Sequence, residues 1–408
     1  MRGSLTRPIL LVFGILFAIY HFGWRGETGI RRVRYGVSSN SRSTGARTNP
    51  GSLESLEDLG LAEDECRDIF PGLMNEVDRT VANGPFKRQL AALHQIYRAI
   101  TSSPTPFVYA RPGHIASTAT TSSSSFVTQP ASKAHSFPMP HFSAWSWALP
   151  FLNSLPAASS VITNLEATLP FSRKDPRAVW RGTPWFANPS GVNPRLRQDL
   201  VRVAGKGNAA WADVQSLDWT TNSASASNGL PIQDFCRYKY VIHTEGVSYS
   251  GRFSFHRMCR SVILTPPLEW FEPTTHLLRP VFSTALLRGR AEFEVEMREN
   301  PRAHPSKRTR EIWPIDVNPD DANIVFVKPD WSDLEETVAW LEAHPSVAEG
   351  IAARQRDQFV GGGYVSKAAE TCYWRSLLKG WKEVAQVDEG DLPEGVTFED
   401  FILSPEAR

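Results

Sequence analysis

Residues 235–271, FCRYKYVIHTEGVSYSGRFSFHRMCRSVILTPPLEWF, hold the pattern that decides the fold. An aromatic and β-branched run at 238–243 predicts a strand, and the apolar run at 261–264 predicts a second strand, which two prolines close. Between them lie a loop of small residues at 244–251 and a segment at 252–260 that fits a short helix. The order strand, loop, helix, strand predicts a βαβ unit.

The loop of this unit favours an anion. Backbone N–H groups of such a loop and the N-terminus of the following helix converge on one point, where negative charge is stabilised. Small residues let the backbone approach a ligand closely: Gly246, Ser248, Ser250 and Gly251. Arg252 adds a fixed positive charge at the start of the helix, so a diphosphate suits this place. The alternative is an ordinary βαβ turn with a surface arginine, because a Gly/Ser loop before a helix is a weak motif.

Short motifs in and around this stretch occur in a specific order along the chain. They are WRGT at 180–183, WADV at 211–214, CRYKY at 236–240, EGVSYSGR at 245–252, SVIL at 261–264, EW at 269–270, VKPDWSDL at 327–334 and TCYWR at 371–375. In this order and spacing they resemble glycosyltransferase family 90, the capsule-associated and Rumi-like protein O-glucosyltransferase family, and its fungal members most closely. The resemblance covers residues 61–385. It implies an α/β protein with two Rossmann-like domains facing a cleft (GT-B type), where a nucleotide-sugar donor binds.

A second strand–loop–helix unit precedes the central one. Residues 178–183 fit a strand that enters a glycine turn, and residues 194–204 fit a helix with proline in its first turn. Arg181, Thr183 and Arg195 lie near the loop of this unit. By resemblance, Thr183 and Arg195 match family positions that contact the nucleotide diphosphate, and a bidentate arginine suits phosphate oxygens. The alternative is a surface arginine on an ordinary helix.

The predicted nucleotide-sugar site joins the two units. Its members are Arg181, Thr183, Arg195, Val247, Ser248, Tyr249, Ser250, Gly251, Arg252 and Glu269. Glu269 follows the second strand of the central unit, where a carboxylate holds ribose hydroxyls in other nucleotide folds, or where it is a solvated loop acid. Arg252 would stabilise the leaving diphosphate. We expect no metal ion or other cofactor, since a cationic loop and helix N-termini can neutralise a diphosphate without magnesium.

The predicted catalytic base is a histidine. Residues 137–147, FPMPHFSAWSW, resemble a family segment that supplies a carboxylate as base on the acceptor hydroxyl. Here Ser136 stands near the expected aspartate, and His141 replaces the aspartate after Pro140. Serine accepts no proton near neutral pH, whereas the imidazole of His135 or His141 does. The alternatives are two structural histidines, and a protein that binds a nucleotide sugar without turning it over.

The four cysteines are widely spread, at Cys66, Cys236, Cys259 and Cys372. They lack the close pairing of a zinc site and allow three disulfide pairings. Cys236 precedes the strand and Cys259 ends the helix of the central unit, so a bridge between them is geometrically reasonable and leaves Cys66 with Cys372. The family resemblance favours the same pairing. The alternative is four reduced, buried thiols.

Residues 8–24 form a 17-residue run without charge, PILLVFGILFAIYHFGW. At about 1.5 Å per residue the run is roughly 26 Å long, enough for a thin bilayer. No small-residue cleavage site follows, so we expect an uncleaved membrane anchor. Arginines on both sides leave the orientation open from charge alone. The family's topology implies a lumenal catalytic domain in the Golgi or endoplasmic reticulum.

The expected domains follow from the anchor and the motifs. They are an anchor at 1–24, a flexible stem at 25–56, an acceptor-side Rossmann-like domain at 57–177 completed by a helix at 366–386, a nucleotide-sugar-binding Rossmann-like domain at 178–365, and a tail at 387–408. Two segments match the family poorly: a Ser/Thr tract at 117–132 and a charged segment at 288–310, which we expect to be a mobile insertion. Ser332 with Glu335 predicts a capping box.

Composition describes a globular chain. The 408 residues are 41% hydrophobic and 21% charged, which allows two domains with a full core. A net charge of +1 gives no indication of a nucleic-acid partner. We predict a membrane-anchored glycosyltransferase that moves xylose or glucose from a UDP-sugar to a hydroxyl of a glycan, a glycolipid or a protein. The alternative is a non-catalytic relative that binds a nucleotide sugar.

Overall fold

The computed structural model describes residues 56–87, 138, 140, 154–189, 191–205, 210–219, 226–300 and 302–386. The predicted anchor at 8–24, the Ser/Thr tract at 117–132 and the tail at 387–408 lie outside these residues, as does the stem except for its last residue. Within the described ranges, no helix has both the length and the apolarity that a bilayer span needs.

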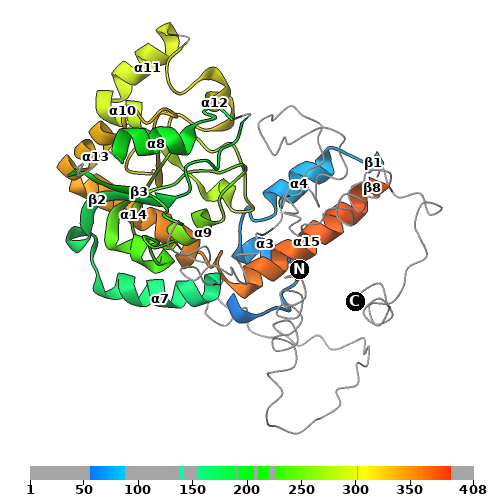
Figure 1. Cartoon of the computed structure of the whole chain (residues 1–408). Helices are drawn as coiled ribbons and strands as arrows, with labels where there is room; N and C mark the ends of the chain where they lie inside the picture. Colours follow the sequence, from blue (N-terminus) through cyan, green and yellow to red (C-terminus); the bar gives the residue numbers. More distant parts are fainter. Residues whose placement is uncertain are drawn as a thin grey trace, which may run out of the picture. The chain divides into compact units, whose positions relative to one another are not determined.

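A six-stranded parallel sheet forms the centre of the described chain (Figure 1). Its strands are β2 (Asp175–Gly182), β3 (Ala212–Ser216), β4 (Tyr238–Ile242), β5 (Val262–Thr265), β6 (Pro280–Phe282) and β7 (Ile324–Phe326). They lie in the order β3-β2-β4-β5-β7-β6, and each neighbouring pair is parallel. Every residue of β5, β6 and β7 is buried, as expected for a parallel sheet covered on both faces. The predicted α/β class and the central βαβ unit are confirmed.

Alternate residues of the strands pack against different helices. Trp180 and Tyr240 belong to a core shared with α8 (Leu196–Ala204), α13 (Leu334–Ala343) and α14 (Pro345–Arg356). Val179 and Val241 belong to a core shared with α7 (Leu155–Thr168) and α9 (Arg252–His256). Four short turns connect these elements: η2 (Phe171–Arg173), η3 (Ile232–Arg237), η4 (Thr275–Leu277) and the π-helical η5 (Asp357–Gly361). Because successive side chains of a strand point to opposite faces, each strand contributes to the packed layers on both sides of the sheet.

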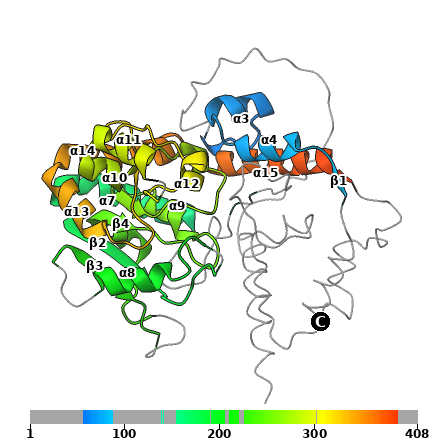
Figure 2. The ribbon, with the colours of Figure 1, turned by 90° about the horizontal axis from the view of Figure 1, so that it is seen from above.

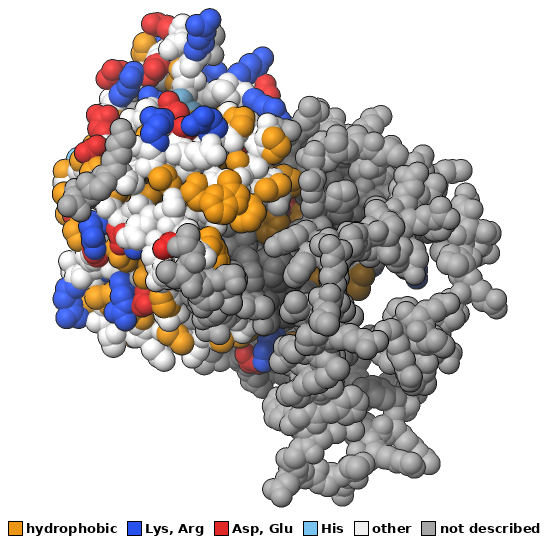
Figure 3. Space-filling view, viewed as in Figure 1, with side chains coloured by type: hydrophobic (Ala, Val, Ile, Leu, Met, Phe, Trp, Pro, Cys, Tyr) orange, Lys and Arg blue, Asp and Glu red, His pale blue; other side chains and the backbone are white. Residues whose placement is uncertain are grey.

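The charged segment at 288–310 is folded, so the predicted mobile insertion is wrong for its described residues. After α10 (Ser283–Arg288) it forms α11 (Arg290–Glu299) and leads into α12 (Lys307–Ile312). Phe293 and Met297 are buried in a core with Trp313. These two residues are one helical turn apart and anchor α11, while charged side chains of both signs cover the end that carries it (Figure 3). Because so few apolar residues mark α11, the sequence shows no clear helical period there.

Two helix starts and one helix end differ from the prediction. The helix predicted at 194–204 begins at Leu196, and the helix predicted at 252–260 ends at His256. The predicted capping box at Ser332 is wrong, because α13 begins at Leu334 and Asp333 is its N-cap residue. The Asp333 carboxylate accepts hydrogen bonds from the Ser283 hydroxyl at 2.5 Å and the Lys328 N–H at 3.0 Å. It thereby joins the start of the helix to the sheet layers.

A separate helical pack joins the two ends of the described chain. Helices α3 (Glu63–Ile69) and α4 (Asn75–Ala82) lie beside α15 (Lys367–Val384) in both ribbon views (Figures 1 and 2). The Cys66–Cys372 disulfide crosses this pack, and the Cys236–Cys259 disulfide closes the central unit. Both predicted bridges are confirmed. Strands β1 (Phe86–Lys87) and β8 (Ala385–Gln386) pair in parallel beyond the helices.

The second Rossmann-like domain stays a prediction. Before α7, the described elements lie in residues 56–87, which form two helices and a two-residue strand. Helix α7 falls inside the range 57–177 assigned to that domain, yet its Ala158 and Ile162 pack in the core with the sheet residues Val179 and Val241. The layers around the sheet therefore begin at residue 155.

Candidate functional site

The direction in which the sheet is built reverses between β2 and β4. From β2 the chain passes through α8 to β3 on one side, and it then returns to β4 on the other side of β2. At such a switch point the carboxyl ends of two neighbouring strands open onto a crevice, where α/β sheets bind ligands. Thr183 follows β2 at this place, and residues 243–251 follow β4.

Two arginines converge on this crevice. Arg252, at the start of α9, donates a hydrogen bond to the carbonyl of Arg181. Arg197, in the first turn of α8, is buried and donates from Nε to the carbonyl of Glu245 at 2.9 Å and from Nη1 to the carbonyl of Thr183 at 3.3 Å. Among the described residues, no carboxylate forms an ion pair with either guanidinium. Both side chains are therefore held by carbonyl groups alone.

The two guanidinium groups create an unbalanced positive charge. Burial lowers the pKa of Arg252 to about 10. Burial, and then repulsion from Arg252, lower the pKa of Arg197 to about 9. Both groups are thus protonated at neutral pH. A buried charge is costly unless an opposite charge compensates it, so the crevice is suited to a multiply charged anion.

Gly246 allows this arrangement. A Cβ atom at this position would lie 3.2 Å from Nη2 of Arg197, closer than ordinary van der Waals contact. The absence of a side chain therefore lets the guanidinium lie against the loop backbone. Helix α9 has only five residues, so its dipole is small and the arginines supply most of the positive potential.

The other predicted donor-binding cations lie differently. Arg181 is buried and forms an ion pair with Asp213 at 2.9 Å, so its charge is already balanced. The Arg195 side chain is 69% exposed and lies 3.9 Å from Asp199. Thr183 is buried at the end of β2. The structure brings Thr183 and Arg252 to one crevice, and the contacts of all these residues with a nucleotide stay predictions.

A cavity of about 70 Å³ adjoins the crevice on the side of β5. Glu245, Gly246 and Glu269 line it, together with residues that follow β5 and residues of α12. The Glu269 carboxylate accepts a hydrogen bond from the Val192 N–H at 2.6 Å and so ties the segment before α8 to the segment after β5. Its predicted contact with ribose is not tested by this arrangement.

The Glu245 carboxyl group lines this cavity and has a raised pKa. It accepts hydrogen bonds from the backbone N–H groups of Glu269 at 3.1 Å and Trp270 at 2.9 Å. Burial, helped by the charges of Glu269 and Glu272, outweighs these two hydrogen bonds and raises the pKa of Glu245 to about 8. The group is therefore mostly protonated at neutral pH, so it can donate as well as accept a hydrogen bond.

Replacing Glu245 by glutamine should stabilise the protein above neutral pH. The pKa of Glu245 rises on folding from 4.5 to about 8, so the native state loses stability as the pH rises through this window. Glutamine has no such cost, and we expect Glu245→Gln to gain on the order of 2 kcal/mol over wild type between pH 5.5 and pH 8.5. Urea unfolding at both pH values measures the gain. The exposed Glu349→Gln is the control, and equal gains in both variants would contradict the prediction.

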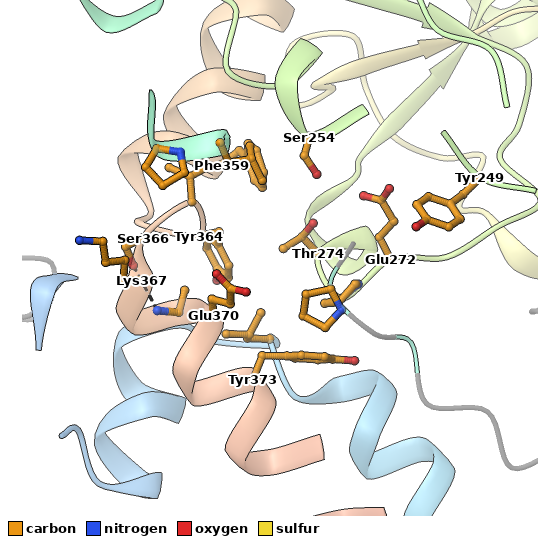
Figure 4. Close-up of a pocket in the computed structure, with 17 residues that line it drawn as sticks. Tyr249, Ser254, Glu272, Thr274, Phe359, Tyr364, Ser366, Lys367, Glu370 and Tyr373 are labelled. Carbon is orange, nitrogen blue, oxygen red and sulfur yellow. Dashed lines mark hydrogen bonds between the residues drawn. The ribbon is translucent and has the colours of Figure 1, made fainter. Parts of the chain in front are cut away.

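A second cavity, of about 110 Å³, is lined in part by Tyr249 of the loop after β4 (Figure 4). One wall carries Tyr249, Ser254 and Glu272, and α15 supplies Glu370 and Tyr373 to the opposite wall. Glu245 and Gly246 line the first cavity and Tyr249 lines the second, so the residues between β4 and α9 contribute to both. Residues from the helical pack and from the sheet layers both line this second cavity.

The predicted bases His135 and His141 lie outside the described residues. Two prolines of the same segment are described. Pro140 lines the second cavity, and the carbonyl of Pro138 accepts a hydrogen bond from the Tyr373 hydroxyl at 2.5 Å. Pro140 therefore contributes to the second cavity, while the histidine assignment stays a prediction.

Three charged residues of the site are missing from the sequence prediction: Arg197, Glu245 and Glu272. One signal for Arg197 exists in the sequence. It stands three residues before Leu200 and seven before Ala204, and all three are buried on one face of α8. A cation on an apolar helical face indicates a buried role. Glu245 and Glu272 lie in loops, where spacing carries no comparable signal.

Comparison with known proteins identifies a family and several relatives that this chain resembles. Residues 126–283 match the model of the family described as Glycosyl transferase family 90. The chain is similar to Protein O-glucosyltransferase 1 of Homo sapiens, with 24% identity over 219 residues, 53% of this chain and 44% of that protein. It is also similar to the O-glucosyltransferase rumi homolog of Anopheles gambiae, with 22% identity over 219 residues and the same two coverages. The O-glucosyltransferase rumi of Drosophila melanogaster is 22% identical over 224 residues, 54% of this chain and 44% of that protein.

The chain is therefore distantly similar to O-glucosyltransferases, and it spans less than half the length of these relatives. The matched region contains β2, α8, β4 and α9, which form the switch-point crevice. A closer relation to the fungal and capsule-associated members stays a prediction.

Proposed function

We propose that this protein transfers a sugar from a UDP-sugar to a hydroxyl group of an acceptor. The observation that carries the proposal is the pair Arg197 and Arg252, two cations without a carboxylate partner among the described residues, at the switch point of the sheet. A diphosphate supplies the missing negative charge at this place. The similarity to O-glucosyltransferases supports the same assignment.

The diphosphate of the donor lies between Arg197 and Arg252 in this proposal, and the nucleoside enters the cavity lined by Glu245 and Glu269. When the bond between the anomeric carbon and the diphosphate oxygen breaks, negative charge grows on the departing UDP. Guanidinium groups held in place before the reaction stabilise that charge without reorganising. We expect them to act without a metal ion, so turnover should survive addition of EDTA.

The sugar is xylose or glucose, and the acceptor is a glycan, a glycolipid or a protein hydroxyl. We further propose that residues 8–24 anchor the protein in the membrane of the Golgi or endoplasmic reticulum with its catalytic part in the lumen. The two disulfides support a secretory location, because disulfides persist in oxidising compartments.

Calorimetric titration tests the proposal. The full chain is produced in an oxidising host and titrated with UDP, UDP-glucose and UDP-xylose, and release of UDP from each sugar nucleotide is followed. We expect UDP to bind with a dissociation constant of roughly tens of micromolar and one donor to release UDP. Binding without release from any donor, with an acceptor panel present, would favour the non-catalytic alternative. A folded protein that binds no UDP would refute the crevice as a donor site.

A further inference from the structure

The second cavity combines apolar walls with a small number of polar groups. Apolar and aromatic side chains line most of it: Leu73, Leu155, Phe359, Tyr364, Val365 and Tyr373. Its acidic members are Glu272, which follows β5, and Glu370, which comes from α15. Figure 4 shows the Glu272 carboxyl group beside Ser254 and Tyr249, and Glu370 across the open space near Tyr373. The carboxyl groups disfavour an anionic occupant, while Lys367 on the same lining disfavours a cationic one, so the largely apolar cavity fits a neutral molecule.

Glu272 is held at the wall nearest to the donor crevice. Its neighbours Tyr249 and Ser254 belong to the loop and helix that also carry Arg252. The Ser254 hydroxyl donates a hydrogen bond to the Glu272 carboxylate, and Arg257 attracts it from behind. A group that acts on the reacting centre must lie near the leaving group. The charge of Glu272 acts on Glu245, whose carbonyl binds Arg197, so Glu272 and the donor arginine have a neighbour in common.

We propose that the second cavity binds the acceptor as a neutral, hydroxyl-bearing molecule and that Glu272 is the general base of the transfer. The proposal rests on the proposed function. The Glu272 carboxylate takes the proton of the acceptor hydroxyl, and the acceptor oxygen forms a bond to the anomeric carbon. The bond from that carbon to the diphosphate oxygen breaks, and its electron pair leaves with UDP, which the arginines of the crevice receive.

The surroundings of Glu272 suit this task. Burial raises the pKa of Glu272 to about 7, while Arg257 and the Ser254 hydroxyl limit the rise. The carboxylate is thus a stronger base than an exposed glutamate and is ionised above neutral pH. The titratable and charged groups that face it are Arg257 of the segment after α9, Glu245 and Tyr249 after β4, and Tyr364, Lys367, Glu370 and Tyr373 around α15.

This assignment provides a carboxylate for a chain whose family-matched segment has none. Glu272 is distant in sequence from residues 135–141, yet the described Pro140 lines the same cavity as Glu272. The cavity therefore offers the acceptor a carboxylate from the sheet side. It makes His135 and His141 dispensable for accepting the proton.

The test compares isosteric variants in the full chain. UDP release from the preferred donor, UDP-glucose or UDP-xylose, is followed with water and with a panel of methyl glycosides and serine peptides as acceptors. We expect Glu272→Gln to lower kcat at least about 100-fold, while its dissociation constant for UDP stays within about twofold of wild type. We expect kcat of wild type to rise with pH around 7, and this rise to be lost in Glu272→Gln.

Two further variants keep the result interpretable. Glu272→Asp retains a carboxylate and should keep the pH-dependent rise at a reduced rate, whereas the double variant His135→Ala/His141→Ala should keep most of the turnover. Turnover by Glu272→Gln equal to wild type would overturn the base while leaving the donor site intact, and so would collapse of turnover in the double variant alone. Wild-type protein that binds UDP but transfers to no acceptor would overturn the proposed function itself, and the base with it.

Discussion

Arg252→Ala is expected to lower turnover at saturating UDP-sugar about 1,000-fold and to raise the dissociation constant for UDP about 30-fold. Its guanidinium is held at the crevice by the carbonyl of Arg181, and no carboxylate among the described residues balances its charge. The charge is therefore available to the donor, and its effect is greatest when UDP departs. The larger loss in turnover than in binding is the mark of a group that acts in the transition state.

Two arginine variants of α8 provide a second test and a control for this result. Arg197→Met keeps much of the buried volume and removes the second cation, and we expect UDP binding to weaken by a similar factor. Arg202→Ala removes an arginine that is 58% exposed and lies 3.3 Å from Asp199, and it should leave UDP binding unchanged. Calorimetry with UDP and steady-state assays of UDP release measure both. An Arg252→Ala protein with normal UDP affinity and turnover would show that the crevice is not the diphosphate site.

Removing the Cys66–Cys372 disulfide, as Cys66→Ser/Cys372→Ser, is expected to cost about 5 kcal/mol of stability, against about 3 kcal/mol for Cys236→Ser/Cys259→Ser. The two bridges span 306 and 23 residues, so the first restricts the unfolded chain far more. The Cys66–Cys372 disulfide also joins α3 to α15, and the core of this helical pack is small and separate from the sheet. We expect the helical pack to detach first.

Urea unfolding of both double serine variants, followed by tryptophan fluorescence, measures these differences. Hydrogen exchange of Cys66→Ser/Cys372→Ser locates the detachment. With increasing urea, exchange of backbone amides should rise in α3, α4 and α15 before it rises in β4 and β5. The second cavity takes Tyr373 and Glu370 from α15, so the same variant should lose transfer to an acceptor before it loses UDP binding. Equal destabilisation by the two variants would show that loop length does not set the effect.

Much of the sheet was predictable because its signals are local. The β-prone run at 238–243 forms β4, and the apolar run at 261–264 lies within one residue of β5. Proline and glycine mark the ends of both units, and helical spacing over 366–385 matches α15. Helix α11 was not predictable in this way. Its two buried residues are one turn apart, and most of its other residues are charged, so the sequence shows only a weak apolar period.

The sequence alone determined the α/β class, the central βαβ unit and Arg252 as a cation at the loop, while for the disulfides it left alternatives that the structure decided. These features depend on neighbours along the chain or on motif order, and such information is present before folding. The tertiary structure alone decided that Arg197 enters the crevice, that Arg181 is neutralised by Asp213, and that Glu245 and Glu272 carry raised pKa values. Charge balance and desolvation depend on which groups meet in space, and the strands that bring these groups together are distant in sequence.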